Sequence, residues 1–213
     1  MAAETRTRIL AASEVLFRRQ GYAAVGMKQI VSKANAPFGS IYHFFPGGKQ
    51  QLCAEVVFAA GRVYGELITT IFDPADDMPT GFRNFFSGAA MVLEASGYQD
   101  ACPIAVIALE AASTNEPIRQ ATHQVFNSWV DLLSKRLVQA GATQTQATDF
   151  AQFALATLEG AFMLARAARS TQPIRSCGEF VADAAGRLLS LPVPDIVDAD
   201  RIDAAHSHKE KSG

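Results

Sequence analysis

The residues best suited to direct chemistry lie together near the start of the chain: Phe38, Gly39, Ser40, Tyr42 and His43. Ser40 can exchange a hydrogen bond with a base edge or a phosphate, Tyr42 can reach a phosphate, and Phe38 can contact a thymine methyl group. Gly39 would let a helix backbone approach DNA closely. Packing roles are the alternatives for Gly39 and Phe38. The set indicates recognition of double-stranded DNA.

Three further side chains are candidates for the same DNA surface. Lys49 is expected at the N-terminus of a helix, where its charge adds to the positive end of the helix dipole and suits a phosphate. Lys28 and Gln29 are expected near the start of an earlier helix, as phosphate or base-edge contacts. For each of the three, a solvated surface position is the alternative. Arg18 and Arg19 are expected to be solvated.

The segment 5–52 has the layout of a helix-turn-helix that would position these residues. It predicts a first amphipathic helix up to Gly21, a second helix over residues 27–34, a tight turn at 35–37 and a third helix over residues 38–44. In such a unit the last helix enters the major groove while the preceding helix contacts the backbone. The apolar residues of the third helix that we expect in the core are Ile41, Phe44 and Phe45.

The distribution of charge supports this interpretation. The whole chain has a net charge of −2 and a pI near 6.1, which by themselves do not suggest a nucleic-acid partner. The first 50 residues, however, carry seven Lys or Arg against two Glu, whereas the rest carries twelve basic and nineteen acidic residues. A basic N-terminal unit on an acidic body places the phosphate-attracting surface at one end.

Other classes of protein are disfavoured by what the sequence lacks. The three cysteines are far apart, with no CxxC pair and no zinc spacing, so we expect no disulfide framework, metal site or cofactor. The four histidines stand at 43, 123, 206 and 208 without a recognised catalytic motif, so we expect no enzyme. No signal peptide or membrane-spanning run is visible. We therefore expect a reduced cytoplasmic protein.

The apolar residues repeat at helical spacing along almost the whole chain, which predicts an all-α fold of about nine helices and no sheet. The domains we expect are a helix-turn-helix, three-helix headpiece over residues 1–48, an effector-binding and dimerisation domain over 49–194, and a loose polar tail over 195–213. Thr80 is expected to cap one helix, and capping boxes are expected at Thr143 with Gln146 and at Ser176 with Glu179.

The second domain is rich in aromatic residues that could line a cavity for a small apolar or aromatic effector. Polar groups on otherwise apolar helices are the better indicators, because a buried carboxylate or imidazole needs a partner that a ligand can supply. Glu159 is one such group. The candidate pocket residues are Phe86, Cys102, Glu110, His123, Phe126, Asn127, Trp129 and Phe162. A close-packed core without a ligand is the alternative.

The last two expected helices, over residues 143–169 and 176–191, carry more apolar surface than one contact needs. Small residues lie among the large ones and permit close helix approach. Paired with a second copy, these helices could form a four-helix bundle. The candidate interface residues are Phe153, Leu158, Phe162, Val181 and Leu188. The alternative is that both helices are core elements of a monomer.

The N-terminal quarter of the chain resembles the TetR family of transcriptional regulators. The matching residues are Arg8-Ile9-Leu10-Ala11-Ala12, Leu16-Phe17, Gly21-Tyr22, Met27, Ile30, Ala34, Gly39-Ser40-Ile41-Tyr42, Phe45-Pro46, Lys49 and Leu52. The strings Pro46-Gly47-Gly48-Lys49 and Ala101-Cys102-Pro103-Ile104 are similar to the LmrA/YxaF-like branch. The chain departs from the family at Val25-Gly26, where hydroxyl residues are usual, at Phe38, where Lys is common, and at Phe44, where His is common.

This resemblance implies a homodimeric regulator, most often a repressor, that binds a near-palindromic DNA operator and releases it when a small-molecule effector enters the second domain. Two other classes stay open from the sequence. One is a helical dimer that binds a small molecule without specific DNA binding, which the basic headpiece disfavours. The other is a catalytic helical bundle, which would need a metal or cofactor.

Overall fold

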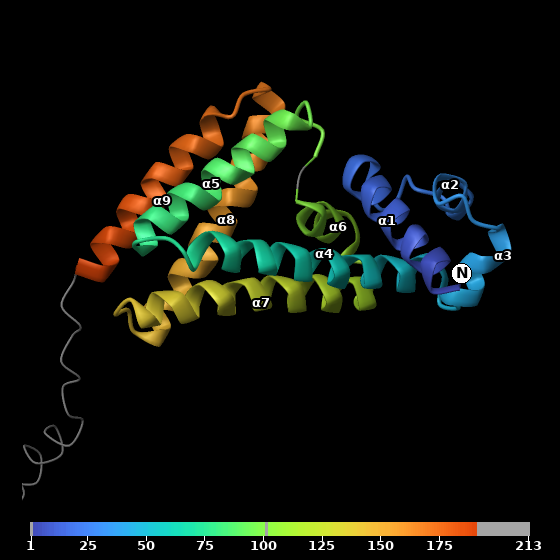
Figure 1. Cartoon of the computed structure of the whole chain (residues 1–213), viewed down its shortest axis with the longest axis horizontal. Coiled ribbons are helices and arrows are strands. Elements are labelled where there is room, and N and C mark those ends of the chain that lie inside the picture. Colours follow the sequence, from blue (N-terminus) through green and yellow to red (C-terminus); the bar gives the residue numbers. More distant parts are fainter. Residues whose placement is uncertain (1, 101, 191–213) are drawn as a thin grey trace, which may run out of the picture.

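The computed structural model describes residues 2–100 and 102–190, and within these the chain folds into nine helices without a strand (Figure 1). The all-α prediction is therefore confirmed. The predicted tail over 195–213 lies outside the described residues. The helices are α1 (Ala2–Gln20), α2 (Met27–Lys33), α3 (Phe38–Phe44), α4 (Gly48–Phe72), α5 (Met78–Ala95), α6 (Pro103–Ala111), α7 (Glu116–Gln139), α8 (Gln144–Ala168) and α9 (Gln172–Ser190).

Helices α1, α2 and α3 form the N-terminal headpiece, with α2 and α3 arranged as a helix-turn-helix. The headpiece core is made of apolar residues from all three helices and from the turn that follows α3. Its fully buried members are Ile9, Phe17, Ile30, Ile41 and Phe45. Phe44 is half-buried and packs against this core. Burial of one face of each short helix leaves the opposite face of α3 exposed.

The 25-residue helix α4 joins the headpiece to the rest of the molecule, and Figure 1 shows it running beside α7 through the middle of the fold. The two helices approach closely at Gly61, where an added Cβ would lie 2.6 Å from a Val125 methyl carbon. The indole of Trp129 donates a hydrogen bond of 2.9 Å to the Gly61 carbonyl oxygen. Helix α4 is therefore firmly attached to α7, and it also contacts α1 of the headpiece.

The far part of the molecule is built from α5, α8 and α9. In Figure 1, α5 and α9 run alongside each other, and these two helices share the most extensive packing in the structure. Gly178 of α9 permits this approach, since an added Cβ would lie 2.6 Å from the Phe86 Cβ. Phe86 is consequently a core residue of the α5–α9 contact.

Two predicted helix starts are wrong by about one turn each. Helix α5 begins at Met78, because Asp77 rather than Thr80 is the cap and accepts a hydrogen bond from the Thr80 backbone N–H. Helix α9 begins at Gln172, so Ser176 and Glu179 lie inside it rather than at its capping box. The capping box of Thr143 and Gln146 at the start of α8 is confirmed.

Candidate DNA-binding surface and effector cavity

The exposed face of α3 carries most of the residues predicted to contact DNA. Phe38 and Tyr42 are 46% and 50% exposed, and their rings meet edge to face with centroids 5.8 Å apart. Gly39 and His43 are also exposed, and nothing lies within 4 Å of the position a Cβ would take at Gly39. Ser40 is half-buried, and its hydroxyl donates to the Pro37 carbonyl oxygen. This face combines two aromatic rings, an imidazole and an open stretch of backbone.

Lys28 and Gln29 are exposed at the start of α2, whereas Lys49 makes contacts within the headpiece. The Lys49 ammonium lies 4.4 Å from the centroid of the Tyr22 ring and donates to the Ala23 carbonyl oxygen at 3.3 Å. Partial burial lowers the pKa of Lys49, although the nearby carboxyl of Glu110 acts in the opposite direction. Lys49 therefore helps to fix the turn between α1 and α2, and a phosphate would have to compete with these contacts.

A largely enclosed cavity of about 160 Å³ lies between α4, α5, α7 and α8. Most of its wall is apolar, and its aromatic side chains are Tyr64, Phe85, Trp129 and Phe162. Its aliphatic part includes Leu67, Ile68, Ile71, Val92, Leu155 and Leu158. Besides Tyr64, the ionisable side chains that reach it are Arg18, Asp100, Cys102 and Glu159. An apolar chamber with a few polar groups is the usual form of a small-molecule site.

Glu159 is an acidic group on the wall of this cavity, away from bulk water. Burial raises its pKa to about 7, and the neighbouring Cys102 thiol acts in the opposite direction. Burial likewise raises the pKa of the Cys102 thiol. The Glu159 carboxyl can thus be protonated or ionised near neutral pH, depending on what lies beside it.

Arg18 enters the same cavity from the headpiece helix α1, so the prediction that it is solvated is wrong. Its side chain is only 19% exposed, and its Nη2 lies 3.1 Å from a carboxylate oxygen of Asp100. Arg19 reaches the other oxygen of Asp100 at 3.1 Å. Nothing in the local sequence indicates this pairing, because Asp100 follows α5 and comes beside α1 only in the folded chain.

Of the eight predicted pocket residues, three line the cavity and five lie elsewhere. Three of them, Cys102, Trp129 and Phe162, do line the cavity. Phe126 packs edge to face on Trp129 without lining it, and Phe86 lies in the core.

The polar candidates Glu110, His123 and Asn127 also lie away from the cavity. Glu110 accepts a hydrogen bond of 3.0 Å from the Ala23 backbone N–H and so contacts the headpiece. His123 and Asn127 are exposed and pair with each other at 3.1 Å. Besides the three predicted residues that remain, the cavity wall includes Glu159, which the sequence also indicates, and Arg18 and Tyr64, which it does not.

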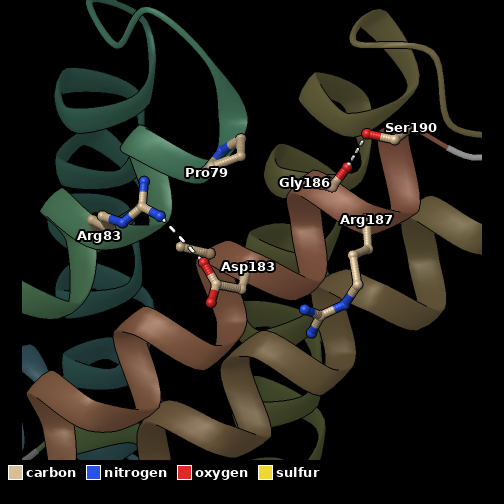
Figure 2. A pocket seen from close by; sticks show the side chains of 7 residues that line it. Pro79, Arg83, Asp183, Gly186, Arg187 and Ser190 are labelled. Atoms are coloured by element: carbon tan, nitrogen blue, oxygen red, sulfur yellow. Dashed lines mark hydrogen bonds and ion pairs between the residues drawn. The ribbon is translucent and has the colours of Figure 1, made fainter.

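Two larger hollows are open to solvent. One lies between α5 and α9 and has a volume of about 560 Å³; Figure 2 shows Arg83 of α5 pointing across it to its partner Asp183 of α9. The other is a groove of about 870 Å³ along α4 and α7. Because water fills such open surfaces, neither offers the desolvation that the cavity beside Glu159 provides.

The predicted dimer residues divide between the inside and the surface of the protomer. Leu158 and Val181 are buried, while Phe162 and Leu188 are half-buried. Phe153 is 48% exposed. Other large apolar side chains exposed on α8 and α9 are Met163, Leu164 and Phe180.

Comparison with known proteins identifies the family. Residues 9–56 match the bacterial regulatory proteins of the tetR family, and residues 79–180 match the C-terminal domain of LmrA/YxaF-like transcriptional regulators. The chain belongs to the TetR family of transcriptional regulators, and its headpiece is the family's DNA-binding helix-turn-helix. The predicted resemblance, including the LmrA/YxaF-like branch, is confirmed.

Two relatives from Bacillus subtilis illustrate the similarity. The uncharacterized HTH-type transcriptional regulator YxaF is 31% identical over 80% of this chain and 90% of its own length. The HTH-type transcriptional regulator LmrA is 28% identical over 84% of this chain and 96% of its own. A TetR-family regulator of known structure from Cytophaga hutchinsonii superposes with a TM-score of 0.78 at 18% identity, covering 90% of this chain and 98% of that one.

None of the helices in 2–100 and 102–190 is long and apolar enough to cross a membrane. In the same part of the chain, no three His, Cys, Asp or Glu side chains come together as potential metal ligands. His206 and His208 lie outside it.

Proposed function

We propose that the protein is a homodimeric repressor that binds a near-palindromic operator and releases it when a small aromatic effector occupies the cavity beside Glu159. The observation that carries this proposal is the position of the cavity. Its wall includes α4, the helix that follows the headpiece, and Arg18 of α1. A ligand there can favour one orientation of the headpiece over another, by as much as its affinities for the two states differ.

The DNA-binding part of the proposal assigns different roles to α3 and α2. Phe38 and Tyr42 stand exposed on α3, from which they would contact base edges and the adjoining backbone. Lys28 is exposed at the start of α2 and would contact phosphate. Base contacts discriminate between sequences, whereas a phosphate contact contributes equally to all of them.

We expect Phe38→Ala to lower the preference for the operator over a scrambled duplex by about tenfold, because an apolar base contact is lost. Lys28→Ala should instead weaken binding to both duplexes alike and reduce the slope of log affinity against log salt by about one. Fluorescence anisotropy with the protein's own upstream DNA, over a salt series, measures both quantities. Val138→Ala removes an exposed apolar side chain near the end of α7 and serves as the control.

Weak binding that is equal for both duplexes in the unsubstituted protein would contradict the operator proposal. It would favour the alternative of a ligand-binding helical protein without specific DNA recognition. An unchanged operator preference in both Phe38→Ala and Tyr42→Ala would contradict the roles assigned to α3 while leaving operator binding in place.

The homodimer is proposed from the exposed apolar surface of α8 and α9. Phe153, Gly160, Met163 and Leu164 recur at helical spacing on α8, and nothing lies within 4 Å of a Cβ added at Gly160. Phe180 is 72% exposed on α9. A surface with large side chains around an open glycine allows the helices of two protomers to approach closely. The dimer would then carry two headpieces, one for each half-site of the operator.

Met163→Glu combined with Phe180→Glu is expected to convert the dimer to a monomer, because each dimer would then bury four carboxylates. Light scattering after size-exclusion chromatography measures the mass. Val63→Glu places the same charge at an exposed apolar position on α4 and is expected to leave the dimer intact. A dimer that survives the double substitution with unchanged mass would place the interface elsewhere.

A further inference from the structure

Arg18, a residue of the cavity wall, carries one hydrogen-bond donor that the protein leaves unused. The Nε of Arg18 is buried and has no hydrogen-bond partner, and it is the one buried side-chain nitrogen or oxygen in this condition among the described residues. A buried donor without an acceptor costs about 1–3 kcal/mol, and more when it is charged. Such a group is unusual in a folded protein and indicates a partner supplied from outside the chain.

The remaining contacts hold the guanidinium group of Arg18 in place. Its Nη2 is paired with Asp100 at 3.1 Å, and its Nη1 lies 3.8 Å from Glu14 of the same helix. Arg18 also lies beside Tyr64 of α4, and its positive charge lowers the pKa of this phenol against the larger, opposite effect of burial. The guanidinium is thus held by its own neighbours, while its Nε–H has no acceptor within the protein.

The size and walls of the cavity restrict that ligand. A volume of about 160 Å³ is close to that of an engineered protein cavity of about 150 Å³ that binds benzene. Four aromatic side chains contribute to the wall, and such rings favour another ring at their faces and edges. The chamber therefore suits one aromatic ring with small substituents.

The polar groups on the cavity wall determine which substituent the aromatic ring of the ligand should carry. Arg18 Nε–H needs an acceptor, and the Glu159 carboxyl, close to half-ionised at neutral pH, accepts a hydrogen bond when ionised. An aromatic carboxylate would satisfy Arg18 but would add a second negative charge beside Glu159. A hydroxyl on the ring can accept from Arg18 and also has a proton to donate.

We propose that the cavity binds a single-ring hydroxylated aromatic compound and that Arg18 of the DNA-binding headpiece is the residue that binds its hydroxyl oxygen. This inference rests on the proposed effector function of the same cavity and specifies its ligand class. It makes the effector a direct contact of α1, in addition to its contacts with α4. Ligand occupancy would then be transmitted to the headpiece through Arg18 and its partner Asp100.

The test compares p-cresol with p-xylene, which has the same shape but carries a methyl group in place of the hydroxyl. Binding is followed by the fluorescence of Trp129, which lines the cavity and is the single tryptophan of the chain. Isothermal titration calorimetry supplies an independent affinity. We expect the protein to bind p-cresol at least tenfold more tightly than p-xylene, because only the phenol satisfies the Arg18 donor.

Two substitutions of Arg18 and one of Arg19 locate the origin of this preference. Arg18→Met removes the donor and the charge, and Arg18→Lys keeps a charge that can pair with Asp100 but has no Nε–H. In both, the preference for p-cresol should fall to threefold or less. Arg19→Met is the matched control, because it removes the other ion pair to Asp100 without altering the cavity wall, and it should retain the full preference.

Equal affinity for the two compounds, binding of neither, or an undiminished preference in Arg18→Met would overturn the inference. These measurements use the protein without DNA, so their outcome is independent of whether it recognises an operator. Selective phenol binding together with no operator preference would retain the assignment of Arg18 and reject the proposed repressor function. Operator release by an effector whose binding does not depend on Arg18 would retain the proposed repressor function and reject the assignment of Arg18.

Discussion

Replacing Gly61 with leucine is expected to destabilise the protein by about 3 kcal/mol, since a larger side chain there must separate α4 from α7. An added Cβ alone would lie 2.6 and 2.7 Å from the two Val125 methyl carbons, which are buried and cannot move aside freely. Separation of the helices would also stretch the hydrogen bond from Trp129 to the Gly61 carbonyl oxygen. Urea unfolding followed by circular dichroism measures the loss.

A rescue experiment tests the stated cause. Gly61→Ala alone should be destabilising, and Val125→Ala alone should cost the free energy of a small buried cavity. The double variant should be more stable than the sum of the two single effects predicts, because the space opened at 125 accommodates the new methyl group. Gly88→Ala is the control, as nothing lies within 4 Å of a Cβ at this helical glycine. Strict additivity in the cycle would rule out the steric explanation.

The raised pKa of Glu159 is expected to make the fold less stable as the pH rises through neutrality. Below about pH 4.5 both the folded and the unfolded chain hold the proton, so the group has no effect. Between about 4.5 and 7 the unfolded chain has released the proton while the folded chain retains it, so the free energy of unfolding falls with pH. Above about 7 the penalty is complete, at about 3 kcal/mol.

Glu159→Gln should remove this dependence and should be the more stable protein at pH 8, because an amide has no charge to bury. The relevant measurement is the difference in unfolding free energy between the two proteins from pH 5 to pH 8, in which the titration of other groups cancels. Cys102, Arg18, Asp100 and Tyr64 share the cavity and should be left unsubstituted. A difference that stays constant over this range would mean that Glu159 is ionised throughout, contrary to its burial.

The sequence predicted the helices well and the cavity poorly, for a physical reason. A helix follows from contacts three or four residues apart, so the apolar spacing within 38–44 and the capping box at Thr143 could be recognised locally. The cavity depends on which distant helices meet. Trp129 was identified as an aromatic on an apolar helix, but Arg18 resembles any solvated arginine until Asp100 is brought beside it.

The pocket predictions that are wrong have the same cause, because local sequence does not show which residues of a helix face the cavity. His123 and Asn127 lie one turn apart on α7 and pair with each other in solvent, a geometry that the sequence alone cannot distinguish from two residues facing a ligand. Glu110 is also exposed, and its carboxylate accepts from a backbone N–H of the headpiece instead of facing the cavity. Local sequence therefore indicates which residues on a helix are polar, but not which of them the fold buries.

The contact made by Glu110 limits how freely the headpiece could be exchanged between regulators. Gly21 ends α1 with a φ of +81°, and the Glu110 carboxylate occupies the space that a side chain at position 21 would need. The same carboxylate accepts from the backbone of Ala23. A chimaeric protein that joins a foreign headpiece to this α6 keeps this contact only if the headpiece has a glycine at position 21 and a free N–H two residues later. Exchange of headpieces in this architecture therefore favours those that carry this small match to the other half of the molecule.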